Sequence, residues 1–230
     1  MDARPHIIAD EQVPFLEGIT EKHARITRMP GNLIDKQAIR NANALLVRTR
    51  TVCSASLLEN SRISFIGSPT IGTDHIDMDY CASAGIVVAN APGCNAEAVM
   101  QYVFTALVAW AGSHICDLRN KTLGIVGVGN VGKKVAALAS HLGMRTILND
   151  PPRAEAEGPE GFSDIGFLLE QSDIVTMHVP LTELTLNMAD NHFFSSMKKG
   201  ACFINTFRGA VADEKALYRA APNLGGIILY

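Results

Sequence analysis

Three glycines with the spacing G-x-G-x-x-G are the residues of this chain with the clearest chemical meaning. Gly127, Gly129 and Gly132 follow an apolar run at residues 123–126 and open a helical pattern. A second apolar run then ends in Asp150, eighteen residues after Gly132. A strand, a glycine turn, a helix, a second strand and an acid form, in that order, the pattern of a dinucleotide-binding unit.

Each position in this pattern has a physical reason. We expect Gly127 to allow a tight turn, Gly129 to let a pyrophosphate approach the backbone, and Gly132 to let the helix pack on the sheet. The N–H groups at the start of the helix, around Asn130 and Val131, would then receive the phosphates. A glycine-rich turn without a ligand is the other interpretation of the same residues.

The acid at the end of the second run predicts NAD as the dinucleotide. A carboxylate at Asp150 would accept bonds from the adenosine ribose hydroxyls and would repel the 2′-phosphate of NADP. Arg153, three residues later, argues in the opposite direction because its cation would attract that phosphate.

The elements that must position these residues alternate along the whole chain, which predicts parallel sheets covered by helices on both faces. The predicted strands are His6–Ala9, Ala24–Met29 (the weakest), Leu45–Arg48, Ile63–Gly67, Ile86–Ala89, Leu123–Val126, Arg145–Asn149, Ile174–His178, Ala201–Asn205 and Gly226–Tyr230. The predicted helices are Leu33–Arg40, Ser54–Asn60, Met78–Ala84, a long apolar helix capped by Asn95, the helix after Gly129, Asp164–Gln171, Asp190–Met197 and Asp213–Ala220.

This alternation predicts an α/β protein with two parallel-sheet units. We expect a flavodoxin-like substrate domain over residues 1–95, an interdomain helix over 96–119 and a Rossmann dinucleotide-binding domain over 120–230. The segment PPRAEAEGPEG (151–161) is predicted to be a polar loop. Because the last apolar run, GGIILY, has no helix after it, the second domain is expected to be incomplete at its carboxyl end.

Composition restricts the partners and the compartment. Hydrophobic residues make up 47% and charged residues 19% of the 230 residues, a balance typical of soluble globular proteins. The net charge of −3 gives no reason to expect nucleic acid or a membrane as a partner. Five cysteines without a C-x-x-C pair, and an N-terminus without a signal-peptide core, favour a cytoplasmic protein with reduced thiols.

Five segments of the chain resemble the D-isomer-specific 2-hydroxyacid dehydrogenases in order and spacing. They cover nearly the whole chain and are GTDHID (72–77), NAPGCNAEAV (90–99), GIVGVGNVG (124–132), HVPLT (178–182) and INTFRGAVAD (204–213). Three segments resemble one branch of this family, which oxidises 4-phospho-D-erythronate to its 2-oxo acid in vitamin B6 biosynthesis. These are LLVRT (45–49), APGCNA (91–96) and DPPRA (150–154).

The resemblance implies an oxidoreductase that uses NAD, binds a small phosphorylated 2-hydroxy acid and forms a homodimer when full length. It also implies cofactor contacts from Val179, Pro180 and Thr206. No metal is predicted.

Arg208 is the predicted catalytic residue. It follows the predicted strand at 201–205, and its planar guanidinium is suited to holding a substrate carboxylate through two hydrogen bonds. Asn205, Arg208 and Gly209 match the N-x-x-R-G motif of the family. A solvated surface arginine is the alternative interpretation.

Hydroxyl and cationic side chains of the first unit are candidates for holding the substrate. Thr49 and Thr70 follow predicted strands, and the resemblance implies substrate contacts at both. Ordinary turn residues are the other interpretation of these threonines. Arg48 and Arg50 are candidates for attracting a 4-phosphate, and they are equally well explained as solvated charges.

Histidines in two motifs are interpreted as structural. His178 has the side chain most often used as a general base, but in the family the segment HVPLT contributes mainly loop backbone beside the cofactor. Asp74, His75, Asp77 and Asp79 have a spacing that could pass for a metal cluster. A turn followed by a helix start explains that spacing more simply.

The catalytic set that the family resemblance implies is only partly contained in the sequence. The family's glutamate and acid/base histidine are expected beyond Tyr230, and Tyr230 stands where the family usually has an aspartate for the nicotinamide carboxamide. Three interpretations follow. The chain is part of a working dehydrogenase, a non-catalytic NAD-binding or dimerising module, or a dehydrogenase for another acid such as glycerate or 3-phosphoglycerate.

Overall fold

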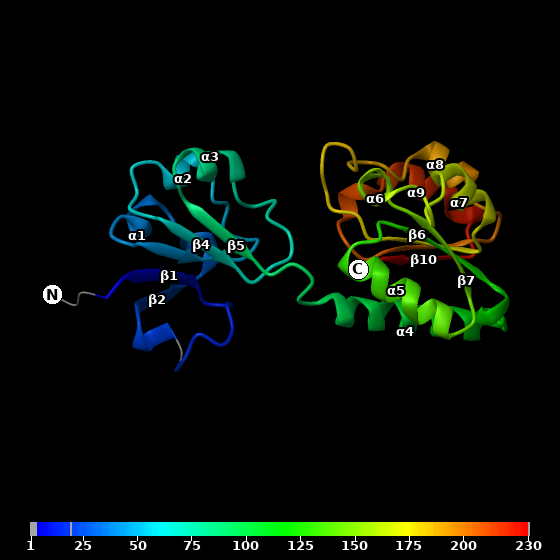
Figure 1. Cartoon of the computed structure of the whole chain (residues 1–230), viewed down its shortest axis with the longest axis horizontal. Coiled ribbons are helices and arrows are strands. Elements are labelled where there is room, and N and C mark those ends of the chain that lie inside the picture. Colours follow the sequence, from blue (N-terminus) through cyan, green and yellow to red (C-terminus); the bar gives the residue numbers. More distant parts are fainter. Residues whose placement is uncertain (1–3, 19, 230) are drawn as a thin grey trace. The chain divides into compact units, whose positions relative to one another are not determined.

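A computed structural model describes residues 4–18 and 20–229 and divides the chain into two compact units, Met1–Cys94 and Asn95–Tyr230 (Figure 1). Each unit is built on a five-stranded parallel sheet. The predicted α/β class and the two parallel sheets are therefore confirmed. Tyr230, for which we predicted a departure from the family, lies outside the described residues.

The sheet of the first unit has the strand order β2-β1-β3-β4-β5, the flavodoxin-like order. Its strands are β1 (His6–Asp10), β2 (Arg25–Met29), β3 (Ala44–Leu46), β4 (Phe65–Ser68) and β5 (Val87–Asn90), and its helices are α1 (Lys36–Ile39), α2 (Ala55–Leu58) and α3 (Met78–Ser83). Ile8, Leu45 and Ile66 of the sheet pack with Ile39 and Leu58 of the helices in one buried cluster. The weakest predicted strand, at residues 24–29, forms the edge strand β2.

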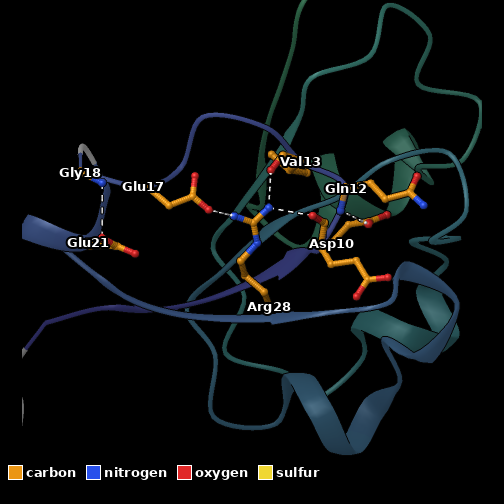
Figure 2. A network of polar contacts seen from close by, with 8 residues as sticks. Asp10, Gln12, Val13, Glu17, Gly18, Glu21 and Arg28 are labelled. Carbon is orange, nitrogen blue, oxygen red and sulfur yellow. Dashed lines mark hydrogen bonds and ion pairs between the residues drawn. The ribbon is translucent and has the colours of Figure 1, made fainter.

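Arg28 holds the loop that follows β1 (Figure 2). Its guanidinium donates to the carbonyl oxygens of Glu11 and Val13, both at 2.7 Å, and pairs with the carboxylate of Glu17. At the start of the loop, the buried Asp10 accepts the N–H of Gln12 at 2.9 Å. The loop is therefore fixed at the carboxyl end of β1 by side chains of two neighbouring strands.

The sheet of the second unit has the order β10-β9-β8-β6-β7. Its strands are β6 (Thr122–Val126), β7 (Arg145–Asn149), β8 (Ile174–Met177), β9 (Cys202–Asn205) and β10 (Gly226–Leu229). The Rossmann order has one further strand, which would pair with the outer edge of β7. Here the residue Ser163 takes part of that place, since its N–H donates to Leu148 O of β7 at 2.7 Å. The unit is Rossmann-like with a short substitute for that strand.

Helices cover both faces of this second sheet (Figure 1). One face packs against α4 (Ala96–His114) and α5 (Asn130–His141), and the other packs against α7 (Ile165–Gln171), α8 (Asn191–Ser196) and α9 (Glu214–Ala220). All residues of β8 and β9 are buried, as expected for interior parallel strands.

The long apolar helix α4 belongs to the second unit. Val103, Phe104 and Leu107 are buried on it, whereas Val108 is 60% exposed. Trp110 Nε1 donates to Gly225 O at 2.9 Å and so ties α4 to the turn before β10. Asn95 occupies the N-cap position as predicted, but its side chain makes no capping hydrogen bond. Over the described parts of the chain, none of the helices has the length and apolar character needed to cross a membrane.

The polar loop predicted over 151–161 is wrong in its first seven residues, which form the helix α6 (Pro151–Glu157). Asp150 caps this helix by accepting the N–H of Arg153, and proline is well tolerated in a first helical turn because its missing N–H has no intrahelical partner there. Gly158 then ends the helix with φ of +100°. The two prolines favour a loop when taken alone, but their place directly after an aspartate favours a helix start.

Candidate functional site

The candidate site lies at the carboxyl edge of the second sheet, where four parallel strands end. Gly127 follows β6, Asp150 follows β7, His178 follows β8 and Thr206 follows β9. Backbone hydrogen bonds hold three of these ends together, since Gly127 N donates to Asn149 O at 2.8 Å and His178 N donates to Val126 O at 2.7 Å. Ligands of open α/β sheets bind at this edge, next to the point where the strand order reverses.

The three glycines of the motif have different surroundings. Gly127 has φ of +87°, and a Cβ there would lie 2.7 Å from the carbonyl oxygen of His178. A Cβ on Gly132 would collide with the carbonyl oxygen of Gly127. A Cβ on Gly129 would meet no atom of the chain within 4 Å. Gly127 and Gly132 are thus required by packing within the unit, whereas Gly129 leaves open space above the backbone.

The start of α5 faces this open space. Gly129 is the N-cap residue, so no side chain caps the helix, and its 12 residues begin with the exposed Asn130 and the half-buried Val131. The first N–H groups of such a helix have no intrahelical partner, and together with the helix dipole they attract anions. An uncapped helix start beside a glycine without neighbours has the form that a bound pyrophosphate requires.

Asp150 is fixed next to the glycine turn. One carboxylate oxygen accepts the N–H of Val128 at 2.7 Å, and the other accepts the N–H of Arg153 at 3.2 Å. The side chain is half-buried. Because each carboxylate oxygen has two lone pairs, both retain the capacity to accept a bond from a ribose hydroxyl. The residues present therefore fit a dinucleotide without a 2′-phosphate.

His178 joins the loop after β8 to the loop after β9. Its Nε2 lies 3.0 Å from Thr176 Oγ1, and its Nδ1 lies 3.3 Å from Thr206 Oγ1. Burial lowers the pKa of His178 from 6.5 to about 4. The imidazole is therefore neutral near pH 7 and acts as a hydrogen-bonded link between two loops. Val179 and the exposed Pro180 follow it, and Val179 Cγ1 would lie 2.8 Å from a Cβ on Gly127.

The buried side chain of Asn205 shapes the loop that carries Arg208. Its Oδ1 accepts the N–H of Phe207 at 3.1 Å, and its Nδ2 donates to Arg208 O at 3.0 Å. The guanidinium of Arg208 lies 5.2 Å from the centre of the Phe207 ring. The asparagine of the N-x-x-R-G motif is thus explained by the two hydrogen bonds that shape this loop. The contact between the Phe207 ring and the arginine is not predicted from the sequence.

A small hollow of about 150 Å³ lies beside Thr206 within the second unit. Its other walls come from the start of α4 and the residue before it, namely Asn95, Ala98, Val99 and Tyr102. None of these four residues is predicted from the sequence to take part in the site. Three of them, Asn95, Ala98 and Val99, lie within the family segment NAPGCNAEAV (90–99), and that segment was the signal that could have indicated their place in the site.

The predicted substrate residues of the first unit follow adjacent strands of their own sheet. Thr70 lies after β4, where its hydroxyl is 2.6 Å from Ser68 Oγ and donates to Gly72 O at 3.0 Å. Ser68 in turn lies 3.2 Å from His75 Nε2, so His75 belongs to a hydroxyl network. Thr49 is exposed in the turn after β3. Across the described residues no group of three potential metal ligands is present.

The guanidinium of Arg48 contacts the loop after β1. Its Nη1 donates to Gln12 Oε1 at 3.1 Å. Arg50 lies exposed in the turn that also contains Thr49. Of the two candidate phosphate ligands, Arg50 is therefore the more accessible one.

Comparisons with known proteins place these features in a family. Residues 96–225 match the sequence profile of the D-isomer specific 2-hydroxyacid dehydrogenase, NAD binding domain. The erythronate-4-phosphate dehydrogenase of Bacteroides thetaiotaomicron is 44% identical over 232 residues, which cover 96% of this chain and 65% of that protein. The enzyme of the same name from Chromohalobacter salexigens is 44% identical over 215 residues, 92% of this chain and 56% of that protein.

Among solved structures, the D-lactate dehydrogenase of Aquifex aeolicus, in complex with NAD and lactic acid, has a similar fold. It is 27% identical, with a TM-score of 0.84 over 97% of this chain and 76% of that chain. The chain thus spans somewhat less than two thirds of the length of the curated relatives that it matches.

Exchanging single glycines of the motif should separate packing from open space. Gly132→Ala places a methyl group against Gly127 O, so we expect the free energy of unfolding to fall by about 1–3 kcal/mol. Gly129→Ala is the matched control and should change it by less than about 1 kcal/mol, because nothing lies near the new methyl group. Urea unfolding measures both, and equal midpoints for the two variants would contradict the packing role of Gly132.

The lowered pKa of His178 predicts an acid-dependent loss of stability. Below pH 6.5 the unfolded chain binds a proton on this histidine and the folded chain does not, so stability falls as the pH is lowered toward 4. The loss should approach about 1.4 kcal/mol per pH unit. His178→Asn should reduce this slope, and His23→Asn, which removes an exposed histidine, is the control. Unfolding free energies between pH 7 and pH 5 that have the same slope in wild type and His178→Asn would refute the assignment.

Proposed function

The chain belongs to the D-isomer specific 2-hydroxyacid dehydrogenase family, and on this premise we propose that it oxidises a small phosphorylated 2-hydroxy acid with NAD. We propose 4-phospho-D-erythronate as the substrate and the 2-oxo acid as the product, as in vitamin B6 biosynthesis. The observation that carries the proposal is the position of Arg208. It follows β9 at the same sheet edge as the glycine turn and Asp150. The names of the relatives at 44% identity support the choice of substrate.

The dinucleotide is proposed to bind along the carboxyl edge of the second sheet. Gly127, Gly129 and Gly132 form the turn, and the N–H groups of Asn130 and Val131 receive the pyrophosphate. Asp150 accepts bonds from the adenosine ribose. Bound NAD supplies the hydride acceptor.

The opposite end of the dinucleotide is proposed to lie by the loops after β8 and β9. Val179 and Pro180 contribute backbone there, and Thr206 lines the hollow at the start of α4. The hydrogen bond between His178 and Thr206 holds the two loops next to each other.

Arg208 is proposed to hold the substrate carboxylate and to polarise the oxygen at the reacting carbon. A guanidinium keeps its charge at any working pH and presents paired donors to a carboxylate. The Phe207 ring lies against the guanidinium, and the side chain of Asn205 binds the backbone of Arg208. Both contacts restrict where this charge can lie. Arg208 therefore offers a fixed positive charge, which is the form of electrostatic catalysis that costs least reorganisation.

Residues 1–95 are proposed to be the substrate domain, with residues 96–119 connecting it to the dinucleotide domain of residues 120–230. Thr49 and Thr70 would contact the sugar acid, and the exposed Arg50 is the better placed candidate for its phosphate. We further propose that the complete enzyme is a cytoplasmic homodimer. His178 is proposed to be structural, because an imidazole whose pKa is lowered to about 4 is a weak base and both of its nitrogens lie near threonine hydroxyls.

Removing the arginine tests this function. In the complete enzyme, Arg208→Ala should lower kcat/KM for 4-phospho-D-erythronate about 100-fold or more, because a fixed charge in the transition state is lost. NADH formation measures the rate, and Arg219→Ala, an exposed arginine on α9, is the control. An Arg208→Ala enzyme within a few-fold of wild type would refute the role. A wild-type enzyme that prefers glycerate or 3-phosphoglycerate would refute the substrate, and NAD binding without any turnover would favour a non-catalytic module.

A further inference from the structure

The geometry points to Glu157 as a residue that makes the dinucleotide site select NAD over NADP, by holding the guanidinium of Arg153 away from a 2′-phosphate. This inference rests on the proposed function, because it concerns the ribose end of the same site. It answers a question that the sequence raises, namely why a site that presents Asp150 to the ribose has a cation only three residues further along the chain.

Arg153 lies close along the chain to the ribose end of the site. It lies in the first turn of α6, three residues after the residue that would bind the ribose hydroxyls, and its own N–H donates to that carboxylate. An arginine near this point of a dinucleotide fold is the usual means of accommodating the extra phosphate of NADP. Position alone would therefore make Arg153 a ligand for NADP.

The guanidinium of Arg153 is already bound on several sides. Its Nη1 donates to Val128 O at 2.7 Å. Its Nε and Nη2 donate to the two carboxylate oxygens of Glu157, at 2.7 Å and 2.5 Å. The ring of Phe162 lies against it, 5.2 Å from Cζ to the ring centre. The side chain of Arg153 is only 24% exposed.

The two hydrogen bonds to Glu157 fix the direction in which the guanidinium of Arg153 points. A guanidinium and a carboxylate joined by two parallel hydrogen bonds cannot rotate independently, so the paired N–H groups of Arg153 point toward the end of α6. Glu157 is four residues along the same helix, a spacing that brings side chains together on one helix face. The same two N–H groups would be the natural donors to a phosphate.

The charges of the surrounding groups lead to the same conclusion. The hydrogen bond to Glu157 raises the pKa of Arg153, and the hydrogen bond from Arg153 lowers the pKa of Glu157, with a further contribution from Lys133. Lys133, Arg153 and Glu157 line one hollow of about 350 Å³ together with Val128 and Phe162. Glu160 also lines this hollow, but Glu157 is the carboxylate that is hydrogen-bonded to the guanidinium of Arg153. Without it, the guanidinium of Arg153 would be available to a phosphate.

Glu157→Gln tests the inference, because glutamine keeps the size of the side chain and removes its charge. Calorimetric titrations of the full-length protein with NAD and with NADP give both dissociation constants. We expect NADP to bind about tenfold more tightly to Glu157→Gln than to wild type, as one charge-assisted hydrogen bond becomes available. NAD binding should change by less than about twofold. NAD should remain the preferred dinucleotide, because Asp150 is retained.

Two further variants make the result specific. Glu155→Gln removes an equal charge from an exposed position of the same helix and should leave both dissociation constants unchanged. Arg153→Ala combined with Glu157→Gln should lose the gain in NADP binding, since the released guanidinium is then absent. Thermal unfolding of each variant checks that α6 remains folded, and loss of an exposed pair at this spacing should cost only about 0.5 kcal/mol.

The outcomes distinguish this inference from the proposed function. If wild type binds NAD and Glu157→Gln binds NADP no more tightly than Glu155→Gln does, the inference is wrong and the proposed function stands. If the gain persists in the double variant, the cation responsible is not Arg153 and the inference is also wrong. If folded wild type binds neither dinucleotide, the proposed function fails and the inference fails with it.

Discussion

The close approach of backbone segments around Gly127 is the constraint on which the second unit depends. The end of β6, the start of α5 and the loop after β8 meet there in direct backbone contact. A Cβ at Gly127 would overlap the carbonyl of His178, and one at Gly132 would overlap the carbonyl of Gly127. Because α5 can come this close, its uncapped start reaches the edge of the sheet, and the polar groups of the site gather around that point.

Side chains then fix the loops that surround this contact. Asp150 binds the N–H of Val128 and caps α6, so that one carboxylate both shapes the glycine turn and starts the next helix. Asn205 shapes the loop that carries Arg208, since its side chain accepts the N–H of Phe207 and donates to the carbonyl oxygen of Arg208. The side chains of Asp150 and Asn205 thus hold backbone, whereas Gly129 is exposed at the start of α5.

The sequence predicted the parts of this arrangement that depend on local pattern. Alternating apolar runs and helical segments identified all the strands of both sheets, because buried parallel strands read as short continuous apolar stretches. The glycine spacing and Asp150 located the candidate dinucleotide site, and the N-x-x-R-G motif located Arg208. The helix α6 is not predicted from the sequence, because its two prolines favour a loop over residues 151–161. The capping aspartate before them was the signal that a helix starts there.

Other features could not be predicted because they depend on contacts between distant segments. Nothing in the local sequence shows that Phe207 lies against Arg208 or that Trp110 binds the turn before β10. The neutral state of His178 also follows from burial among residues far along the chain. The pairing of Arg153 with Glu157 can be predicted from the sequence only if the segment is known to be a helix. A spacing of four residues brings two side chains together in a helix but not in a loop.

The most direct test of the central claim is to record backbone amide NMR shifts of the full-length protein during a titration with NAD. The account predicts that the largest changes fall on the N–H groups from Gly127 to Gly132 and on those near Asp150, with saturation at one NAD per chain. Unchanged shifts at these amides in a folded protein, or changes confined to other segments, would contradict the claim that the glycine turn and Asp150 form a dinucleotide site.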